Sequence, residues 1–214
     1  ALVRAGHRVH GLVRGEAERL KGLPLEGVHE GNLDAPDEIA DVVATVAPDA
    51  VVHLAGLSFV PAAEEDPRAA YRANVEGTLA VLAAVRARAP RARVLAITSS
   101  EVYGAVTAAE LPITEDTPLR PRTIYGASKA AADVAAGQWA RAYGLDVVRA
   151  RPFNHAGPGQ DAAFVCGALA RQLARAEAGL QPREVRVGNR DPVRDFSDVR
   201  DIAAGYVALL ERGR

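Results

Sequence analysis

Residues 94–104 read VLAITSSEVYG, a short apolar run that ends in three consecutive hydroxyl side chains. The run Val94–Thr98 is rich in apolar and branched residues, which is typical of a strand buried on both faces of a parallel sheet. In open parallel sheets, ligands bind just beyond the carboxyl ends of the strands. The segment therefore predicts a central strand whose last residues face a ligand site.

Similar apolar runs alternate with helical patterns on both sides of this segment. The other predicted strands are Val9–Val13, Ala50–Leu54 and Asp146–Arg151, with a weaker one near Gly27–His29. The predicted helices are Pro36–Ala47, Arg68–Ala89, Ile124–Tyr143 and Phe164–Ala178. This alternation implies right-handed crossovers and an α/β fold with a Rossmann-like, doubly wound parallel sheet.

The regular alternation stops after Arg151. The elements predicted beyond it are a turn at Gly157–Gly159, the helix Phe164–Ala178, a short strand at Glu184–Val187 and a last helix from about Val199, with Ser197 or Asp198 as its N-cap. We expect a dinucleotide-binding Rossmann domain over residues 1–155. Residues 156–214 are expected to form part of a smaller substrate-binding lobe, interleaved with the last Rossmann helices.

The composition is that of a globular protein without a strong charge bias. Hydrophobic residues make up 49% of the chain, and 26 basic residues stand against 27 acidic ones, which leaves a net charge of -1. Such a charge attracts neither nucleic acid nor an anionic membrane surface, and no apolar stretch approaches the roughly 18 residues of a membrane span. The single cysteine, Cys166, excludes an internal disulfide and a Cys-rich metal site. We expect a cytoplasmic protein with no metal and with neither nucleic-acid nor membrane partners.

The first residues, Ala1–Gly6, have the pattern of a last helical turn that ends at a glycine, and the chain contains no methionine. They lack the charged start and the apolar core of a signal peptide. We therefore expect a fragment without its natural start, and the incomplete lobe after Arg151 adds the expectation that the other end is missing too.

Tyr125 and Lys129 stand four residues apart at the start of a predicted helix, so their side chains share one face. A phenol with a pKa of about 10 is a poor acid or base at neutral pH, and a neighbouring ammonium is expected to lower that pKa. Of the 26 basic residues 24 are arginines, so a lysine at this place is notable. The alternative is a chance pair on a solvated helix face.

Ser99 follows the predicted strand Val94–Thr98 directly. A hydroxyl at this strand end could donate a hydrogen bond to a substrate carbonyl oxygen and polarise it. The alternative is a serine-rich turn that satisfies its own backbone. A strand-end serine followed after about two dozen residues by the Tyr125–Lys129 pair is more specific than either part alone.

Longer motifs accompany these residues. Tyr125–Lys129 reads YGASK, Arg151–Gln160 reads RPFNHAGPGQ and Val193–Asp201 reads VRDFSDVRD. With these motifs the chain resembles the extended short-chain dehydrogenases/reductases of the NAD-dependent epimerase/dehydratase family that act on nucleotide sugars. Within that family it is most similar to the branch of GDP-6-deoxy-D-mannose reductases and GDP-mannose 4,6-dehydratases.

This resemblance implies an enzyme that reduces the 4-keto group of GDP-4-keto-6-deoxy-D-mannose to give GDP-D-rhamnose. It implies that Ser99 holds the carbonyl oxygen, that Tyr125 donates the proton, and that Lys129 tunes Tyr125 and holds the cofactor ribose. Glu101 stands where related dehydratases keep the carboxylate that removes the C5 proton. A dehydratase or epimerase of the same fold is therefore an alternative, and a non-catalytic dinucleotide-binding sensor is the alternative from another class.

The resemblance also implies a set of cofactor-binding residues. Beside Tyr125 and Lys129, these are Arg14, Asn32, Leu33, Leu54, Ala55, Gly56, Asn74, Thr98 and Pro152. Arg14 closes a strand where an arginine accommodates the 2′-phosphate of NADP, so NADP(H) is favoured and NAD(H) is the alternative. The small-residue turn Leu54–Gly56 lets the backbone approach the cofactor. For Asn74, a purely structural hydrogen bond between helix and sheet is an equal alternative.

The implied substrate-binding residues are Ser58, Ser100, Asn154, His155 and Arg194. A guanidinium such as that of Arg194 fits two phosphate oxygens of a sugar-nucleotide diphosphate, although an ion pair with Asp195 or Asp198 is the alternative. The expected partners are a small nucleotide sugar and a second copy of the chain. A homodimer would use the helices Arg68–Ala89 and Ile124–Tyr143.

The Gly-rich turn that holds the cofactor pyrophosphate on a helix N-terminus is missing from the chain. In the family it lies roughly 20 residues before the position of Arg14, which places the first strand and this turn before Ala1. We therefore expect the chain to bind a dinucleotide poorly without them.

Overall fold

The computed structural model describes residues 1–15 and 17–213 of the chain. The strands are β1 His10–Val13, β2 Gly27–Glu30, β3 Ala50–His53, β4 Arg93–Ile97, β5 Val147–Ala150, β6 Asn154–Ala156 and β7 Phe196–Asp198. The helices are α1 Pro36–Val46, α2 Val60–Glu65, α3 Pro67–Tyr71, α4 Gly77–Arg88, α5 Ile124–Tyr143, α6 Val165–Glu177 and α7 Val199–Arg212. Short 3₁₀ turns cover Val3–Ala5, Ala17–Leu20, Ser100–Val102 and Ala108–Glu110, and a π turn covers Arg72–Glu76.

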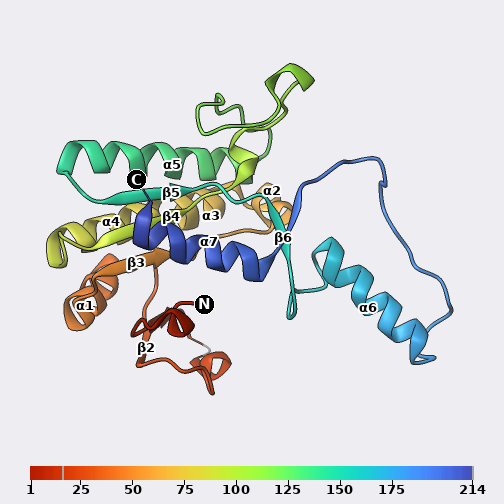
Figure 1. The fold of residues 1–214 in the computed structure, drawn as a ribbon, viewed down its shortest axis with the longest axis horizontal. Helices are drawn as coiled ribbons and strands as arrows, with labels where there is room; N and C mark the ends of the chain where they lie inside the picture. Colours follow the sequence, from red (N-terminus) through yellow and green to blue (C-terminus); the bar gives the residue numbers. More distant parts are fainter. Residues whose placement is uncertain (16, 214) are drawn as a thin grey trace. The chain divides into compact units, whose positions relative to one another are not determined.

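The chain forms two compact units. The larger unit contains Ala1–Pro152 together with the residues from Gly205 onward, and the smaller unit is Phe153–Ala204. In the larger unit, β3, β4 and β5 form one parallel sheet and β1 and β2 a parallel pair (Figure 1). The predicted α/β fold with parallel strands is confirmed. The predicted single sheet is divided, because β1 and β3 are not hydrogen-bonded to each other among the described residues.

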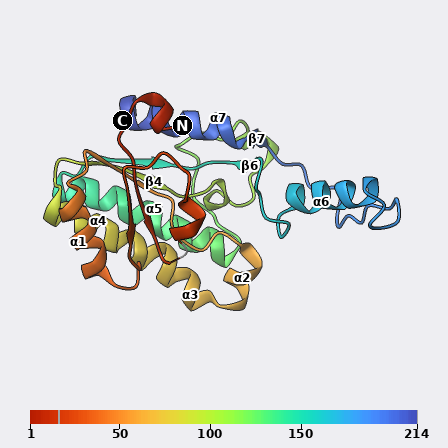
Figure 2. The ribbon, with the colours of Figure 1, turned by 90° about the horizontal axis from the view of Figure 1, so that it is seen from below.

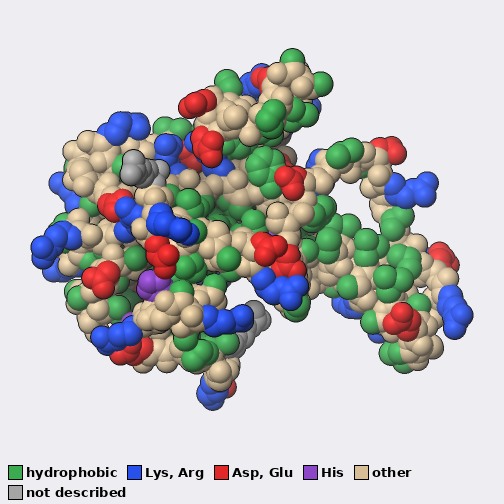
Figure 3. Space-filling view, viewed as in Figure 1, with side chains coloured by type: hydrophobic (Ala, Val, Ile, Leu, Met, Phe, Trp, Pro, Cys, Tyr) green, Lys and Arg blue, Asp and Glu red, His purple; other side chains and the backbone are tan. Residues whose placement is uncertain are grey.

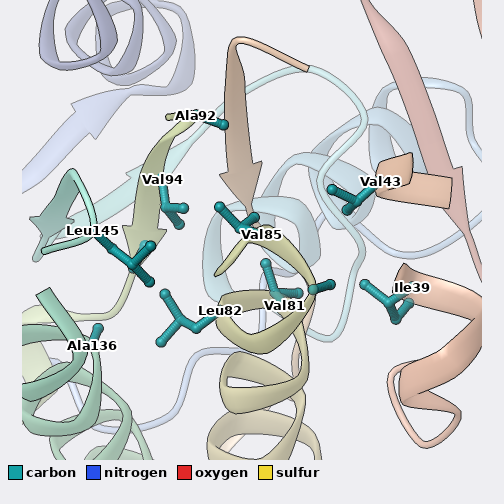
Figure 4. Packing of buried hydrophobic residues seen from close by; sticks show 11 residues of the cluster. Ile39, Val43, Val81, Leu82, Val85, Ala92, Val94, Ala136 and Leu145 are labelled. Atoms are coloured by element: carbon teal, nitrogen blue, oxygen red, sulfur yellow. The ribbon is translucent and has the colours of Figure 1, made fainter. Parts of the chain in front are cut away.

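Helices cover both faces of the three-stranded sheet. Alternate residues of a strand point to opposite sides, so Val94 and Ala96 of β4 pack against α1, α4 and α5, whereas Leu95 packs with the C-terminal part of α7. Figure 2 shows α7 on one side of the strands and α1, α4 and α5 on the other. In the larger cluster, Leu82 and Val85 of α4 are fully buried at its centre (Figure 4).

The ends of the helices follow local signals to different degrees. The predicted bounds of α5 are confirmed, since Thr123 caps its start and Gly144, with a φ of 67°, ends it in the left-handed conformation. The single helix predicted over Arg68–Ala89 is wrong in its middle, where the π turn Arg72–Glu76 separates α3 from α4. Because a π turn holds an extra residue, it shifts the helix faces on either side of it.

The smaller unit contains α6 and a parallel pair in which Asn154 of β6 is opposite Phe196 of β7. These three-residue strands were not predicted, and the predicted strand Glu184–Val187 is wrong. Arg186 lies in this predicted strand. Its N–H donates to the side chain of Gln172 on α6 at 2.8 Å, and its carbonyl accepts from the same side chain at 3.1 Å, so its backbone groups bond to a side chain and not to another strand. As predicted, the last helix begins at Val199, and Asp198 accepts from the N–H of Arg200 as its cap.

Basic and acidic side chains are interspersed on the face of the molecule drawn in Figure 3, in keeping with the small net charge. Among the residues that the structure describes, no helix has both the length and the apolar character that crossing a membrane requires.

Candidate active site

Ser99 lies where β4 ends, as its place in the sequence predicts. Its backbone is extended and its side chain caps the short turn Ser100–Val102, with Oγ accepting from the N–H of Glu101 at 3.2 Å. The same hydroxyl lies near the phenol of Tyr125, because its hydrogen-bonding interaction lowers the pKa of that phenol. The turn that the sequence allowed is therefore present, and it leaves Ser99 near the second predicted catalytic residue.

Tyr125 and Lys129 come from the first turns of α5. They are 9% and 8% exposed, so the alternative of a chance pair on a solvated surface is wrong. Two hydrogen bonds tie the first turns of α5 to other parts of the chain. The Lys129 Nζ donates to the carbonyl of Ile97 at 3.0 Å, and the N–H of Ile124 donates to Glu64 Oε1 at 2.8 Å. The start of α5 is therefore fixed to both the end of β4 and helix α2.

The electrostatics of the pair differ from the expectation that the lysine lowers the pKa of the phenol. Burial raises the pKa of Tyr125, the hydrogen bond with Ser99 lowers it in part, and the charge of Glu101 adds to the increase. Burial also lowers the pKa of Lys129 to about 8, because the low-dielectric surroundings disfavour the ammonium. A phenol that keeps its proton at neutral pH is suited to donate it to a developing alkoxide.

Asn74 lies in the π turn and is 1% exposed. Its Oδ1 accepts from the N–H of Leu57 at 2.9 Å, and its Nδ2 donates to the carbonyl of Leu57 at 3.1 Å and to Ser128 Oγ at 2.9 Å. Ser128 in turn donates to the carbonyl of Tyr125 at 2.8 Å. The structural hydrogen bond that the sequence allowed is present, and it connects the turn after β3 to the helix that carries Tyr125.

Gly56 lies against this amide, and its backbone has a φ of 150°. A Cβ at Gly56 would stand 2.5 Å from Asn74 Oδ1 and 3.6 Å from Lys129 Nζ. Leu54 beside it is 65% exposed, and Ala55 and Gly56 are exposed as well. The turn therefore presents uncovered backbone next to Lys129, as the resemblance expects.

His53 is a buried residue at the end of β3 that the sequence argument missed. Its Nε2 lies 3.1 Å from Thr78 Oγ1, and Thr78 donates its only hydroxyl proton to the carbonyl of Asn74 at 2.6 Å. His53 Nε2 is therefore the donor to Thr78. Burial and the charge of Lys129 lower the pKa of His53 to about 4, which keeps this ring neutral. Its position at the end of a strand could have marked it as a site residue, although a single histidine in an apolar strand is usually part of the core.

Thr98 and Ser100 flank Ser99, and the Thr98 side chain and the Ser100 backbone bond to protein groups. The Thr98 hydroxyl is buried and lies 3.1 Å from Asp133 Oδ2 and 3.0 Å from the carbonyl of Ala150. The N–H of Ser100 donates to the carbonyl of Pro152 at 2.9 Å. Asp133 is fully buried and was also missed, because a carboxylate in a helical pattern usually lies on the surface.

Three of the predicted cofactor-binding residues, Arg14, Asn32 and Leu33, follow the carboxyl ends of β1 and β2. Arg14 and Asn32 line a hollow of about 270 Å³, together with Gly15, Glu30, Gly31 and Glu38. The Asn32 side chain accepts from the N–H of Asp34 at 3.1 Å in a local turn. Leu33 packs on the main hydrophobic cluster and on Gly77 of α4, so part of its surface is already used.

The remaining predicted substrate residues have few contacts. Ser58 in the larger unit is exposed. In the smaller unit, Asn154 begins β6, and His155 Nδ1 lies 2.9 Å from the carbonyl of Phe153. Arg194 is exposed and, within the described part of the chain, contacts only the carbonyl of Val193. Asp198, one of its alternative partners, is paired with Arg200 instead.

The larger unit thus brings Ser99, Tyr125 and Lys129 together beside the Leu54–Gly56 turn. These residues fit a nicotinamide dinucleotide, since Lys129 Nζ has donors beyond its bond to Ile97 and the glycine leaves space near it. The hollow beside Arg14 supplies polar groups and a cation for a further part of such a molecule. The arrangement can hold a carbonyl oxygen and deliver a proton to it.

The curated relatives of the chain are enzymes of nucleotide-sugar metabolism. It is 44% identical to GDP-6-deoxy-D-mannose reductase from Pseudomonas aeruginosa over 185 residues, which cover 86% of this chain and 60% of that protein. It is 33% identical to dTDP-glucose 4,6-dehydratase from Mycobacterium tuberculosis over 186 residues, or 86% of this chain and 54% of that protein. The chain therefore spans about six tenths of the length of the first of these relatives and less of the second.

Solved structures give the same result. RMD from Pseudomonas aeruginosa, complexed with NADPH, superposes with a TM-score of 0.85 at 39% identity over 96% of this chain and 73% of that chain. A double mutant of DesIV, a dTDP-glucose 4,6-dehydratase from Streptomyces venezuelae with NAD bound, superposes with a TM-score of 0.82 at 27% identity over 97% of this chain and 63% of that chain. The NAD dependent epimerase/dehydratase family matches residues 1–214. The resemblance in the motifs is confirmed, and the chain belongs to the NAD dependent epimerase/dehydratase family.

Proposed function

We propose that the protein containing this chain reduces the 4-keto group of GDP-4-keto-6-deoxy-D-mannose to give GDP-D-rhamnose. The observation that carries the proposal is the buried cluster of Ser99, Tyr125 and Lys129, in which the phenol keeps its proton. The identity to a GDP-6-deoxy-D-mannose reductase supports the choice of substrate.

The chemistry needs one hydride and one proton. A bound nicotinamide dinucleotide supplies the hydride to C4 of the sugar. Ser99 holds the keto oxygen by a hydrogen bond, and Tyr125 gives that oxygen its phenolic proton. Lys129 stabilises the phenolate that remains until water returns the proton. The balance is one C–H bond and one O–H bond formed for each dinucleotide oxidised.

NADP(H) is the proposed cofactor, with Arg14 as the residue that meets the 2′-phosphate. Arg14 lines the hollow at the ends of β1 and β2, and the related RMD structure contains NADPH. The test is the ratio of kcat/KM for NADPH and NADH in wild type and in Arg14→Gln. We expect the variant to lose its preference for NADPH, and an unchanged ratio would contradict the role of Arg14.

We further propose that a strand preceding Ala1, followed by the Gly-rich turn, completes the dinucleotide site between β1 and β3. Within the described residues β1 pairs with β2 alone and β3 with β4 alone, so each has one edge without a partner. One parallel strand placed there would join the two sheets. The test compares NADPH affinity for residues 1–214 and for a longer natural chain. Equal affinities would show that the site is already complete.

The nearest alternative is a 4,6-dehydratase that uses Glu101, whose carboxylate raises the pKa of Tyr125 and therefore lies near it. A dehydratase returns its hydride to the sugar and shows no net oxidation of cofactor, so product analysis separates the two reactions. A dinucleotide sensor without turnover is the alternative from another class. The intact set of Ser99, Tyr125 and Lys129 disfavours it.

The first test is the loss of NADPH absorbance when the full-length protein meets GDP-4-keto-6-deoxy-D-mannose. We expect stoichiometric oxidation, and Tyr125→Phe should lower kcat by roughly 10²- to 10⁴-fold without unfolding the protein. Tyr71→Phe is the matched control, because that tyrosine is 40% exposed on α3. No oxidation with wild type, or full activity in Tyr125→Phe, would overturn the proposal.

A homodimer remains part of the proposal. The segments expected to pair include α4 and α5, and on α5 Val134 is 57% and Tyr143 is 43% exposed. Light scattering after size exclusion would test this, with Val134→Glu expected to shift a dimer toward the monomer. A monomeric wild-type protein would refute it.

A further inference from the structure

The catalytic face of α5 continues beyond Lys129 to a buried carboxylate. Tyr125, Lys129 and Asp133 follow one another at spacings of four, so they share one face of the helix. Asp133 is 0% exposed. A carboxylate so deeply buried is stable only when charged or hydrogen-bonding partners surround it. Those partners are arginine and threonine side chains from the ends of β4 and β5.

Arg151 is the main partner of Asp133. Its Nε donates to Oδ2 and its Nη2 to Oδ1, both at 2.8 Å, which makes a two-pronged ion pair. Arg149 adds a third bond to Oδ1 at 2.8 Å, and Thr98 Oγ1 lies 3.1 Å from Oδ2. Burial works to raise the pKa of Asp133, but these bonds and charges outweigh it, so the pKa is lowered and the carboxylate is charged.

The remaining nitrogen of the Arg151 guanidinium is hydrogen-bonded to the loop that follows Ser99. Its Nη1 donates to Tyr103 Oη at 3.1 Å and to the carbonyl of Glu115 at 2.9 Å. The guanidinium carbon also lies 5.3 Å from the centre of the Tyr103 ring. One side chain thus connects α5, the end of β5 and the loop after the turn Ser100–Val102.

Ser99 lies between the points that this cluster fixes. The N–H of Thr98 donates to the carbonyl of Ala150 at 2.8 Å, and the N–H of Ser100 donates to the carbonyl of Pro152 at 2.9 Å. The residues on both sides of Ser99 are therefore bonded to the segment that contains Arg151. Because Arg151 is bonded to α5, it sets the distance between Ser99 on one element and Tyr125 on the other.

We propose that Asp133 and Arg151 are positioning residues that hold Ser99 Oγ in line with the phenol of Tyr125. A buried ion pair is seldom retained for stability, since apolar groups of similar size often stabilise a fold as well. Its two-pronged geometry does fix orientation, which an apolar pair does not. The part of this inference that concerns turnover rests on the proposed reductase function.

The test is Arg151→Lys in the full-length protein, because lysine keeps the charge and loses the fork. We expect kcat to fall about 10- to 100-fold, since a shift of about 1 Å in a reacting group has effects of this size. The KM for NADPH should change less than twofold. When Ser99 moves away from the phenol, its interaction that lowers the pKa of Tyr125 weakens, so the phenol should titrate at higher pH.

A matched control exists at the opposite ends of the same two strands. Arg93 Nε donates to Asp146 Oδ2 at 2.7 Å, and this pair joins the starts of β4 and β5. Arg93 Nη1 also donates to the carbonyl of Leu210 at 3.0 Å. Arg93→Lys therefore makes the same type of substitution at the same two strands, far along β4 from Ser99. It should alter thermal stability at most, and leave kcat and the titration of Tyr125 as in wild type.

The titration of Tyr125 is measured without turnover, by NMR of protein labelled at the tyrosine ring carbons. The signal of Tyr125 is assigned as the one missing in Tyr125→Phe. The groups that act on this phenol are Ser99 and Glu101, and the charge of Tyr125 is also coupled to Tyr206 of α7. If wild type reduces no keto sugar, the proposed function fails while this titration still decides the positioning role.

A folded Arg151→Lys protein with an unchanged titration of Tyr125 would overturn the proposal, whatever its stability. If that variant does not fold, Tyr103→Phe decides, because it removes one acceptor of Arg151 and keeps the ring in its buried place. A higher titration midpoint in Tyr103→Phe supports the proposal, and an unchanged midpoint refutes it.

Discussion

Gly56 allows the closest packing in the candidate site. Its φ of 150° is a conformation that side chains rarely adopt, and a Cβ would stand 2.5 Å from Asn74 Oδ1. That oxygen already accepts from Leu57, so the amide has no free direction in which to move. The glycine is required both for its backbone and for the space beside it.

Gly56→Ala should lower the free energy of unfolding by about 1–3 kcal/mol through strain and the loss of the Asn74 bond. Urea denaturation measures this. Gly22→Ala is the control, because Gly22 has a φ of 82° but nothing within 4 Å of a Cβ. We expect the Gly56 variant to lose clearly more stability than the control, and equal losses would show that the contact with Asn74 is unimportant.

Lys129 predicts opposite effects of pH on stability and on activity. Its pKa is lowered from the ordinary 10.5 to about 8 in the folded chain. Between these pH values the unfolded chain binds the proton and the folded chain does not, so this group makes the protein more stable as pH rises through the window. Below about pH 8 the folded state carries the whole cost of the buried ammonium, on the order of 3 kcal/mol.

Urea unfolding of wild type and Lys129→Met at pH 7 and pH 10 checks this. The stability of wild type relative to the variant should increase at the higher pH, while turnover that needs the ammonium should decrease above about pH 8. A stability difference that stays constant between the two pH values would show that the ammonium is not destabilised by burial.

At the scale of the element, α5 depends on its first turn. Thr123 Oγ1 accepts from the N–H of Gly126 at 2.9 Å, and Glu64 accepts from the N–H of Ile124 at 2.8 Å. Two of the N–H groups that a helix start leaves without partners are thereby satisfied. Tyr125 lies in this same turn, so the cap also fixes a predicted catalytic residue.

Thr123→Ala should cost about 1 kcal/mol of stability, the usual effect of a lost N-cap, and should also lower kcat because the turn around Tyr125 loosens. Thermal unfolding and the NADPH assay measure the two effects. The control is Thr45→Ala, at an exposed position inside α1, where alanine is favoured over threonine. A variant with full activity and lowered stability would show that the Thr123 cap stabilises the helix but does not position Tyr125.

At the scale of the whole molecule, the two units differ in how much they bury. All residues of Phe153–Ala204 are described, and none of them is fully buried, whereas the larger unit contains all four hydrophobic clusters. Between α6 and β7 the chain has no helix or strand, and Val193 is 91% exposed. Segments with so little burial open at low cost in free energy.

Trypsin should therefore cut first after arginines in residues 181–195, the irregular segment that contains Arg183, Arg186, Arg190 and Arg194. Mass spectrometry of the early products identifies the sites. Cleavage after Arg149, which is bonded to buried Asp133, should come only with global unfolding. Early cleavage at that position would contradict the difference between the units.

The sequence predicted what depends on local signals. The bounds of α5 were predictable because both Thr123 and Gly144 are cap residues, and Ser99 because it follows a buried strand. The π turn around Asn74 and the burial of Asp133 were not, since each depends on partners distant in the chain: Leu57 and Ser128 for Asn74, and Arg149 and Arg151 for Asp133. The pKa of Tyr125 was predicted in the wrong direction because burial and the charge of Glu101 both raise it, and only the interaction with Ser99 lowers it.

The scarcity of lysine makes Lys129 easy to follow by chemical labelling. The chain has only one other lysine, Lys21, whose side chain is 73% exposed and paired with Glu18. At pH 8 about half of the Lys129 side chains are neutral amines, the form that attacks acylating reagents. An ordinary surface lysine, with a pKa of about 10.4, is almost entirely protonated there. Peptide mass analysis after brief acylation thus compares one buried amine with one exposed amine in a single tube, so the scarcity of lysine makes the Lys129 side chain a reporter of its own surroundings.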